Sequence, residues 1–325
     1  MGGGEAALLD EIVASVKNHR GLQRKADIGL LSDIIATNGS GVIAAKGEDG
    51  AVLSVDGCNI VFAADGIMEE LADSNPEWAG YCSILVNVHD VLAMGGRPIA
   101  AVNVISAKDE RTISSIVRGM KCACEKFDVK MVGGHLHPKA SHNSISVAMM
   151  GMVRSGKPVL STTAKRGDSV IVICDCRGEF TQGIPYSWDC TSKRTKKEIA
   201  DTMDKVISAL SNFTSAKDIS NPGTIGTLAM LLESSKVGAE VSVDDIALPS
   251  GTELIQWLTA YQGFGFIGTA QEKALKKISS VLEGTGLSVS IIGKITKKRE
   301  LRVKLGSAQR VVFDFTKDSI TGLFN

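Results

Sequence analysis

Residues 86–98 of this chain read VNVHDVLAMGGRP, an apolar helical run that carries Asn87 and Asp90 and closes on a Gly-Gly pair. Asn87 and Asp90 are three residues apart, so they share one face of the predicted helix. A carboxylate on an apolar helix needs a positive partner, because an unpaired charge away from water costs several kcal/mol. A metal ion and an ordered polar network are the two candidate partners.

The composition restricts the class of protein. The 325 residues suffice for two domains, and 44% of them are hydrophobic. The 36 basic and 36 acidic residues cancel, which disfavours a general nucleic-acid binder. The N-terminus lacks the pattern of a signal peptide, and no run reaches the roughly 18 apolar residues of a membrane span. We therefore expect a cytoplasmic protein without nucleic-acid or membrane partners.

Seven cysteines are scattered through apolar segments. This odd count favours reduced, buried thiols over a disulfide framework. Cys122 and Cys124 are two residues apart, as are Cys174 and Cys176, and we expect the side chains of each pair to point away from each other. The predicted role of the cysteines is structural or incidental.

The order of predicted elements in the first half indicates an α/β domain. Residues 5–19 form an amphipathic helix, and Asp56-Gly57 joins two strands as a hairpin. Asn75-Pro76 opens the helix that carries Asp90, with an N-cap and a first-turn proline. Further on, a short strand over 129–132 is expected to run into a loop over 133–138.

A second domain is expected beyond the polar turn that starts at Ser155. This turn divides the chain into an N-terminal domain over 1–155 and a C-terminal domain over 156–325. The C-terminal part again mixes strands and helices and closes with three strands near 288–295, 300–305 and 310–315. The predicted class is therefore a two-domain α/β (α+β) protein.

Three carboxylates lie where elements begin or end. Asp49 follows a glycine-rich turn, Asp65 ends a predicted strand and Asp90 lies on the helix. Carboxylate oxygens suit Mg²⁺, which also bridges to nucleotide phosphates. If the three converge, they form a magnesium-nucleotide site. The alternative is that Asp49 and Asp65 are turn residues that bond their own backbone.

Two weaker signals follow in residues 133–142. Gly133-Gly134 would let backbone N–H groups approach a phosphate, although a plain turn is the simpler interpretation. His135, His137 and His142 could suggest a transition-metal site, but no Cys, Asp or Glu of suitable spacing completes the set.

Taken together, these segments resemble the superfamily of aminoimidazole ribonucleotide (AIR) synthetase, thiamine-monophosphate kinase, selenophosphate synthetase and the hydrogenase-maturation dehydratase. The resemblance runs from Gly47 to Ile295, and residues 86–98 are similar to the VNxxDxxAMGxxP helix of these enzymes. Residues 24–28, 78–81 and 216–233 most resemble the AIR synthase-related group that includes proteins called methanogenesis marker protein 2. The chemistry of that group is not settled.

The resemblance implies an AIR synthetase-like fold. Its N-terminal domain would have a mixed sheet that forms a dimer barrel, its C-terminal domain would be α/β, and ATP would bind in the cleft between them. The cofactors implied are ATP and Mg²⁺, and the partners implied are a small-molecule substrate and a second copy of the chain.

The resemblance also implies roles for individual residues. Asp49, Asp65 and Asp90 match the Mg²⁺-coordinating aspartates, and Gly133-Gly134 matches the phosphate-side glycines. Asp218 and His135 would be catalytic, and Asn221 would face the acceptor. The expected nucleotide-binding set is Gly47, Asp49, Asn87, Asp90, Gly133, Gly134 and His135.

The leading functional hypothesis is ATP- and Mg²⁺-dependent phosphoryl transfer to a small molecule, or its activation through a phosphorylated intermediate. Asn221 stands where the thiamine-monophosphate kinases have the Asp of an SDG motif, which argues against that assignment. The N-terminus lacks the Cys and Lys expected of selenophosphate synthetase. The alternatives are an enzyme similar to either of these, a non-catalytic nucleotide-binding dimer, or a metallohydrolase that uses His135, His137 and His142.

Overall fold

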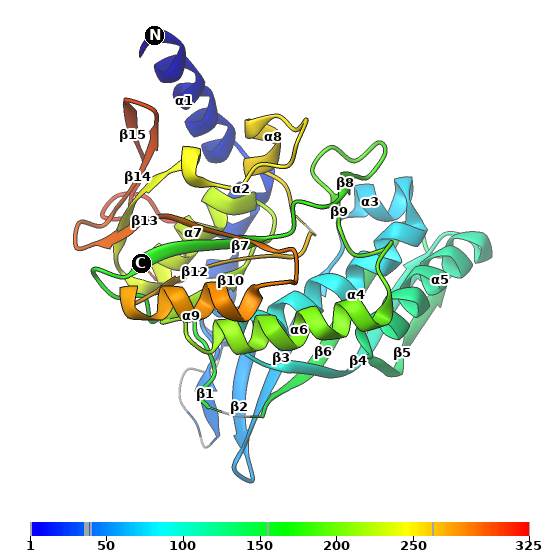
Figure 1. Cartoon of the computed structure of the whole chain (residues 1–325). Coiled ribbons are helices and arrows are strands. Elements are labelled where there is room, and N and C mark those ends of the chain that lie inside the picture. Colours follow the sequence, from blue (N-terminus) through cyan, green and yellow to red (C-terminus); the bar gives the residue numbers. More distant parts are fainter. Residues whose placement is uncertain (1, 36–38, 40, 155, 262, 325) are drawn as a thin grey trace.

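The structure of the chain is a computed structural model that describes residues 2–35, 39, 41–154, 156–261 and 263–324, and it is a mixed α/β fold with two large sheets (Figure 1). The helices are α1 (Gly2–Lys17), α2 (Arg20–Lys25), η1 (Ala26–Leu31), α3 (Glu69–Ser74), α4 (Pro76–Ala93), α5 (Glu110–Phe127), α6 (Lys196–Leu210), α7 (Gly223–Ser235), η2 (Val243–Asp245), α8 (Leu254–Leu258) and α9 (Glu272–Leu282). The strands are β1 (Val42–Ala44), β2 (Ala51–Val55), β3 (Cys58–Gly66), β4 (Arg97–Ala107), β5 (Lys130–Pro138), β6 (Ser144–Val153), β7 (Ser169–Cys174), β8 (Glu179–Phe180), β9 (Trp188–Asp189), β10 (Ser215–Asp218), β11 (Gly238–Ser242), β12 (Gly265–Ala270), β13 (Ser288–Thr296), β14 (Glu300–Leu305) and β15 (Ala308–Asp314).

The first sheet is mixed and has the strand order β1-β2-β3-β6-β4-β5. β4 and β5 are parallel, and the other neighbours are antiparallel. The β2–β3 turn has positive φ angles at Asp56 (49°) and Gly57 (79°), as two-residue hairpin turns require. The predicted hairpin is therefore confirmed. Helices α4 and α5 lie on one side of this sheet (Figure 1).

Helix α4 begins and ends as predicted. The side chain of Asn75 accepts a hydrogen bond from the Trp78 N–H at 3.1 Å, and Pro76 occupies the first turn, where its missing N–H costs nothing. Gly95 follows the helix with φ of 75°, a conformation that favours glycine. α4 is almost wholly buried because it packs on α5, on the first sheet and on β10 of the second sheet.

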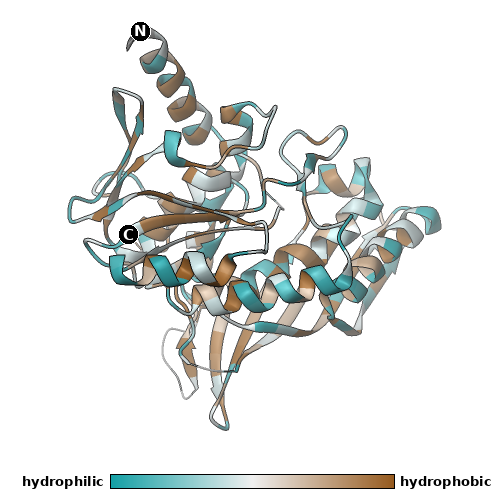
Figure 2. Cartoon of the chain, viewed as in Figure 1, coloured by the Kyte–Doolittle hydropathy of each residue, from teal (hydrophilic) through white to brown (hydrophobic). Residues whose placement is uncertain are grey.

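The second sheet has the order β10-β12-β7-β13-β11-β14-β15. Its strands β7 and β12 are buried along their whole length, and Figure 2 shows β7 as a hydrophobic strand. The predicted N-terminal helix is confirmed as α1, which packs against β14 and β15 and so joins this second sheet in space. The predicted domain boundary begins at residue 155, outside the described residues, and the division there stays a prediction.

One element was predicted wrongly. Residues 133–138 are not a loop, because β5 continues through them to Pro138. The reason is parallel pairing with β4, in which Val102 lies opposite Gly133 and Ala107 opposite Pro138. This edge pairing gives the glycines a strand conformation that their local sequence does not favour.

The described part of the chain has no membrane-spanning helix. None of its helices combines the length and the apolar character that crossing a bilayer requires.

Candidate functional site

Three aspartates form the group of potential metal ligands found among the described residues. Carboxylate oxygens of Asp49, Asp90 and Asp218 all lie within 4.8 Å of one another. Oxygens that share one Mg²⁺ lie at most about 4.2 Å apart, since each is about 2.1 Å from the ion. The group therefore needs to contract by only about 0.6 Å to fit Mg²⁺.

Three separate elements bring these carboxylates together. Asp49 lies just before β2, Asp90 in the last turn of α4 and Asp218 at the end of β10. Asp49 is tied to β10, because its Oδ2 accepts a hydrogen bond from the Asp218 backbone N–H at 3.2 Å. Helix α4 packs on β10, and this packing brings Asp90 close to Asp218. The site thus joins the two sheets.

Asp65 is the fourth carboxylate near this point. It is the second-last residue of β3, is exposed, and lines a cavity together with Asp218. Removal from bulk water raises the pKa of Asp65, and the charge of Asp49 raises it further. Asp65 is therefore electrostatically part of the group, although it is not one of the three ligands that lie closest together.

The buried carboxylates are costly in their charged form. Burial raises the pKa of Asp90 well above its usual range, and the charges of Asp65, Asp218 and Asp49 add to this effect. Burial also raises the pKa of Asp218, and the charge of Asp49 raises it further. Asp90 lies near the C-terminal end of α4, where the helix dipole also disfavours a negative charge. A cation would relieve this repulsion.

Lys217 is a site residue that our sequence analysis did not single out. Its side chain is buried, and its Nζ forms an ion pair with Asp49 Oδ1. Burial by itself lowers the pKa of Lys217, but the charge and hydrogen bond of Asp49 outweigh it and raise the pKa. The strand Ser215–Asp218 is buried along its whole length, and a buried lysine requires a partner for its ammonium, but the four-residue sequence SAKD does not reveal this burial.

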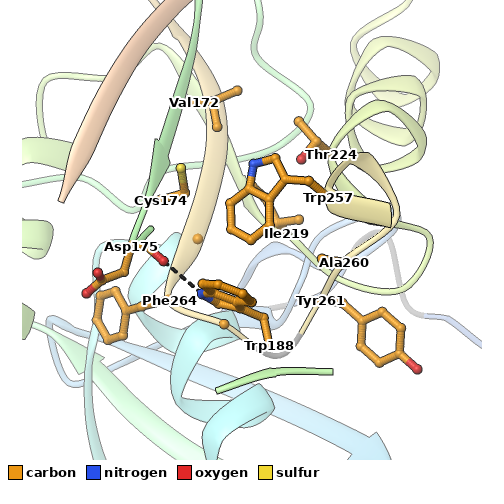
Figure 3. A pocket seen from close by; sticks show the side chains of 12 residues that line it. Val172, Cys174, Asp175, Trp188, Ile219, Thr224, Trp257, Ala260, Tyr261 and Phe264 are labelled. Carbon is orange, nitrogen blue, oxygen red and sulfur yellow. Dashed lines mark hydrogen bonds between the residues drawn. The ribbon is translucent and has the colours of Figure 1, made fainter. Parts of the chain in front are cut away.

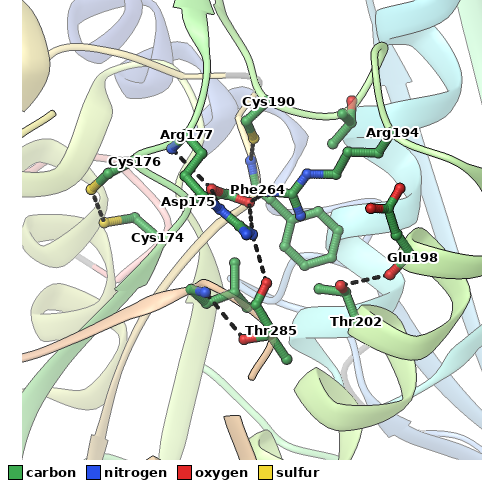
Figure 4. Close-up of polar contacts among 12 residues, drawn as sticks. Cys174, Asp175, Cys176, Arg177, Cys190, Arg194, Glu198, Thr202, Phe264 and Thr285 are labelled. Atoms are coloured by element: carbon green, nitrogen blue, oxygen red, sulfur yellow. Dashed lines mark hydrogen bonds and ion pairs between the residues drawn. The ribbon is translucent and has the colours of Figure 1, made fainter. Parts of the chain in front are cut away.

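Asp175 shows how this protein neutralises a buried carboxylate without a metal (Figure 4). Its side chain is fully buried, and Arg177 Nε donates to it at 3.1 Å while Arg194 forms a second ion pair. Two guanidinium groups thus serve one carboxylate. At the aspartate group of the described structure, three carboxylates share one ion-paired ammonium, with a further charge effect of Lys25 on Asp218, so each has less positive charge beside it than Asp175.

A cavity of about 310 Å³ adjoins the aspartate group. Asp65 and Asp218 line one side, and Arg24 and Lys25 of α2 line another. Asn221, predicted to face the acceptor, does line this cavity. A second cavity of about 460 Å³ shares Arg24, Asn221 and Tyr261 with the first, so the two form one extended cleft. The cleft is large enough for a small molecule.

The aromatic cavity in Figure 3 is a different feature. Trp188, Trp257 and Phe264 line a space of only about 30 Å³, enough for one or two waters. The Trp188 Nε1–H donates to the Asp175 carbonyl at 2.9 Å, and the Trp257 Nε1–H donates to the Ala247 carbonyl at 2.9 Å. With its indoles satisfied and its volume small, this cavity is part of the packed core and not a substrate site.

Two buried polar atoms on the same helix as Asp90, those of Asn87 and His89, have no hydrogen-bond partner among the described residues. Asn87 donates to the Ser83 carbonyl at 3.0 Å, but its Oδ1 is unpartnered. His89 lines the cavity of about 310 Å³ and packs edge-on against Phe264. Its Nε2 has no partner in the described structure. Burial lowers the pKa of His89 to about 3, so its imidazole is neutral. Unpaired polar atoms in one turn of α4 are typical of a site that a ligand completes.

The phosphate-side residues predicted from the sequence lie elsewhere in the protomer. Gly133, Gly134 and His135 are exposed on the edge strand β5. Asp65 pairs with Val147, Val147 with Asn103 and Asn103 with Gly134. Three strand spacings separate Asp65 from Gly134, which is about 14 Å. Their predicted contacts to the nucleotide therefore stay a prediction.

Gly47 lies closer to the aspartates in sequence but packs against the C-terminal tail. A Cβ at Gly47 would lie 2.5 Å from Cζ of Phe324, and its φ is +82°. The Gly47 carbonyl accepts a hydrogen bond from Ser161 Oγ at 2.8 Å. Its predicted contact to the nucleotide stays a prediction.

The histidines do not form a three-ligand site. The rings of His135 and His137 lie 4.4 Å apart, centroid to centroid. His142 contacts Ser141 instead. Within the described ranges, only the aspartates bring three potential ligands together, so the geometry does not favour the metallohydrolase alternative.

The expectation for Cys174 and Cys176 was wrong. Their Sγ atoms lie 3.8 Å apart (Figure 4). Residues two apart in a strand lie on the same face, and Cys176 follows the end of β7. Hydrogen bonding with Cys174 lowers the pKa of Cys176 to about 7. All seven cysteines are free thiols.

The raised pKa of Asp90 predicts a pH-dependent stability difference in metal-free protein. A carboxyl with a raised folded-state pKa costs stability as the pH rises above its unfolded value of about 4. Asp90→Asn removes this cost, so its melting temperature should exceed that of the wild type increasingly from about pH 5 to about pH 8. We expect a gap of at least about 2 °C at about pH 8. Thermal denaturation in EDTA measures it, and a gap that is constant with pH would contradict the assignment.

Comparison with known proteins places this site in a family. Residues 47–153 match the model of the AIR synthase related protein, N-terminal domain, and residues 165–306 match that of the C-terminal domain. The chain belongs to the AIR synthase-related proteins. Asp49, Asp65, Asp90 and Asp218 all fall within the matched ranges, whereas α1 and α2 precede them.

Individual AIR synthase-related relatives cover most of the chain. An uncharacterised protein of Methanocaldococcus jannaschii is 38% identical over 97% of this chain and 99% of that protein. The thiamine-monophosphate kinase of Methanospirillum hungatei is 25% identical over 77% of this chain and 86% of that protein. The solved structure of AaThiL complexed with AMPPCP and TMP has a TM-score of 0.61 at 19% identity, covering 82% of this chain and 91% of that one. This structural similarity confirms the predicted two-domain α/β fold of the AIR synthetase type.

Proposed function

We propose that this AIR synthase-related protein binds Mg²⁺-ATP and uses it to phosphorylate, or to activate through phosphorylation, a small molecule in the cleft beside the aspartates. The observation that carries the proposal is the convergence of Asp49, Asp90 and Asp218 within 4.8 Å, with one ammonium to balance them. A kinase relative and a neighbour solved with AMPPCP support ATP as the nucleotide.

In this proposal the chain's own residues divide into two groups. Asp49, Asp90 and Asp218 would hold Mg²⁺, with Asp65 beside them, and the ion would supply charge neutralisation to the phosphates. Arg24, Lys25 and Asn221 line the cavity next to these carboxylates and would hold the acceptor. Catalysis would rest on positioning, because the cleft fixes where the acceptor meets the nucleotide.

The experiment has two stages. Calorimetry with AMPPCP should show binding that requires Mg²⁺, and release of ADP from ATP should rise when the right phosphorylatable metabolite is added. Absence of Mg²⁺-dependent AMPPCP binding would contradict the proposal. Tight binding without ADP release from any candidate acceptor would instead indicate a nucleotide-binding protein without transferase activity.

We further propose that the protein is a cytoplasmic homodimer that pairs through the first sheet. Helices α4 and α5 cover one face, but the opposite face leaves Phe62, Val102 and Val104 exposed by 49%, 42% and 45%. Ala148 pairs with both Ala64 and Val102, so it links β3 to β4 on this face. Phe62, Val102 and Val104 therefore belong to one continuous patch. An apolar patch on a sheet face is typical of a protein interface.

Val104→Asp should convert this dimer to a monomer. Burying an unpaired carboxylate in the interface costs several kcal/mol, which raises the dimer dissociation constant at least about 100-fold. Sedimentation velocity measures the change. Val117→Asp is the matched control, because Val117 is exposed by 48% but lies on α5, away from the patch. A Val104→Asp protein that stays dimeric would exclude this face as the interface.

A further inference from the structure

Lys217 lies at the aspartate group, where its ammonium forms an ion pair with Asp49. Its side chain is 8% exposed and that of Asp49 is 5% exposed, so their ion pair is shielded from solvent. The same Asp49 carboxylate accepts from the Asp218 backbone N–H through its other oxygen. One carboxylate therefore holds both the ammonium of β10 and the end of that strand.

The charge of Lys217 reaches every carboxylate of the site. It lowers the pKa of Asp65, of Asp90 and of Asp218, in each case against the larger effect of burial. One ammonium cannot balance all of these groups, because Asp49, Asp90 and Asp218 lie within 4.8 Å of one another and Lys217 forms its ion pair with Asp49. Lys217 is thus the single buried cation within an incompletely neutralised group.

We propose that Lys217 is the site's resident counter-ion, which holds Asp49 in the metal-free protein and gives up that contact when a divalent cation binds together with nucleotide. The inference rests on the proposed function, because it assumes that Asp49, Asp90 and Asp218 bind the metal. A divalent cation and the Lys217 ammonium would repel each other if both contacted the same Asp49 oxygen. Metal that binds without nucleotide therefore has to displace Lys217 from Asp49. Lys217 then loses the one ion pair that it forms among the described residues.

Nucleotide changes this competition. Its phosphates carry negative charge into the site and offer the displaced ammonium a new partner. Metal should then bind weakly alone and tightly with nucleotide, which couples the two ligands through Lys217. A residue with a purely structural role at this position would have the opposite effect on metal affinity, since its loss would loosen the aspartates.

The test is Mn²⁺ affinity, measured by calorimetry with and without AMPPCP. Lys217→Met should raise the affinity for Mn²⁺ alone at least tenfold and reduce the enhancement by AMPPCP at least tenfold. Lys217→Arg, which keeps the charge, should retain most of the wild-type coupling. Unchanged or weaker Mn²⁺ binding by Lys217→Met would overturn the inference.

Controls separate this inference from folding and from the proposed function. Lys126→Met removes another partly buried ammonium, which donates to the carbonyl groups of Thr191 and Ser192 at 3.2 and 2.6 Å, and it should leave Mn²⁺ affinity unchanged. If Lys217→Met does not fold, Lys217→Gln should give the same rise. Wild-type coupling that persists in the neutral variants would overturn the role of Lys217 but leave the proposed function intact, whereas no Mn²⁺ or AMPPCP binding by any form would refute both.

Discussion

Asp90→Asn should abolish most Mg²⁺-dependent binding of nucleotide. The substitution keeps the size of the side chain but removes one negative charge from the group of Asp49, Asp90 and Asp218. Substituting a residue that only holds a metal ligand in place typically lowers metal affinity about 10- to 100-fold. We therefore expect the loss of a ligand itself to lower the affinity at least about 100-fold. Calorimetry with AMPPCP and Mg²⁺ measures this loss.

The same variant should remain folded, because an asparagine at position 90 removes the buried charge and its repulsion from the neighbouring aspartates, which together raise the pKa of Asp90. Asp201→Asn is a matched control, since Asp201 is exposed by 61% on α6 and pairs only with Lys197 in the described structure. Asp201→Asn should bind AMPPCP as the wild type does. Equal affinity in the Asp90 and Asp201 variants would exclude Asp90 from the metal site.

Gly119→Ala should cause a large loss of stability, although it adds only one methyl group. A Cβ at Gly119 of α5 would lie 1.9 Å from the carbonyl oxygen of Glu77 on α4, and a Cβ at Gly80 would lie 2.1 Å from that of Ile116. The two helices therefore cross with their backbones in contact. Neither backbone can move aside without disturbing the buried α4, so we expect a loss of about 3 kcal/mol in the free energy of unfolding.

Urea denaturation measures this change, and the melting temperature should fall by about 6 °C or more. Gly4→Ala is the control, because a Cβ at Gly4 of α1 meets no atom within 4 Å. Alanine is the better helix former, so Gly4→Ala should cost nothing. A Gly119→Ala protein as stable as the wild type would show that the α4–α5 crossing is looser than described.

Local rules predicted the elements whose signals are complete within a few residues. Asn75-Pro76 and Gly95 mark the ends of α4, and Asp56-Gly57 marks the β2–β3 hairpin, because caps and two-residue turns depend on their own side chains and φ angles. The loop predicted for residues 133–138 was wrong because their conformation depends on a distant segment. Their strand exists because β4 lies beside it, and no residue within the segment carries that information.

The candidate site shows the same limit. Asp90 could be singled out, because a carboxylate on an apolar helix is conspicuous in a sequence. Lys217 could not be placed beside Asp49, because 168 residues separate them and the contact depends on how β10 meets the turn before β2. The acceptor cavity depends on α2, which lies outside both family matches, and the resemblance of residues 24–28 does not show that Arg24 and Lys25 line a cavity.

The most direct test of this account is the anomalous diffraction of Mn²⁺ in crystals grown with AMPPCP. We predict a peak within about 2.3 Å of oxygens from Asp49, Asp90 and Asp218, in contact with the phosphates of AMPPCP, and Lys217 withdrawn from Asp49. A nucleotide bound elsewhere, with no Mn²⁺ at the aspartates and Lys217 still paired with Asp49, would contradict it.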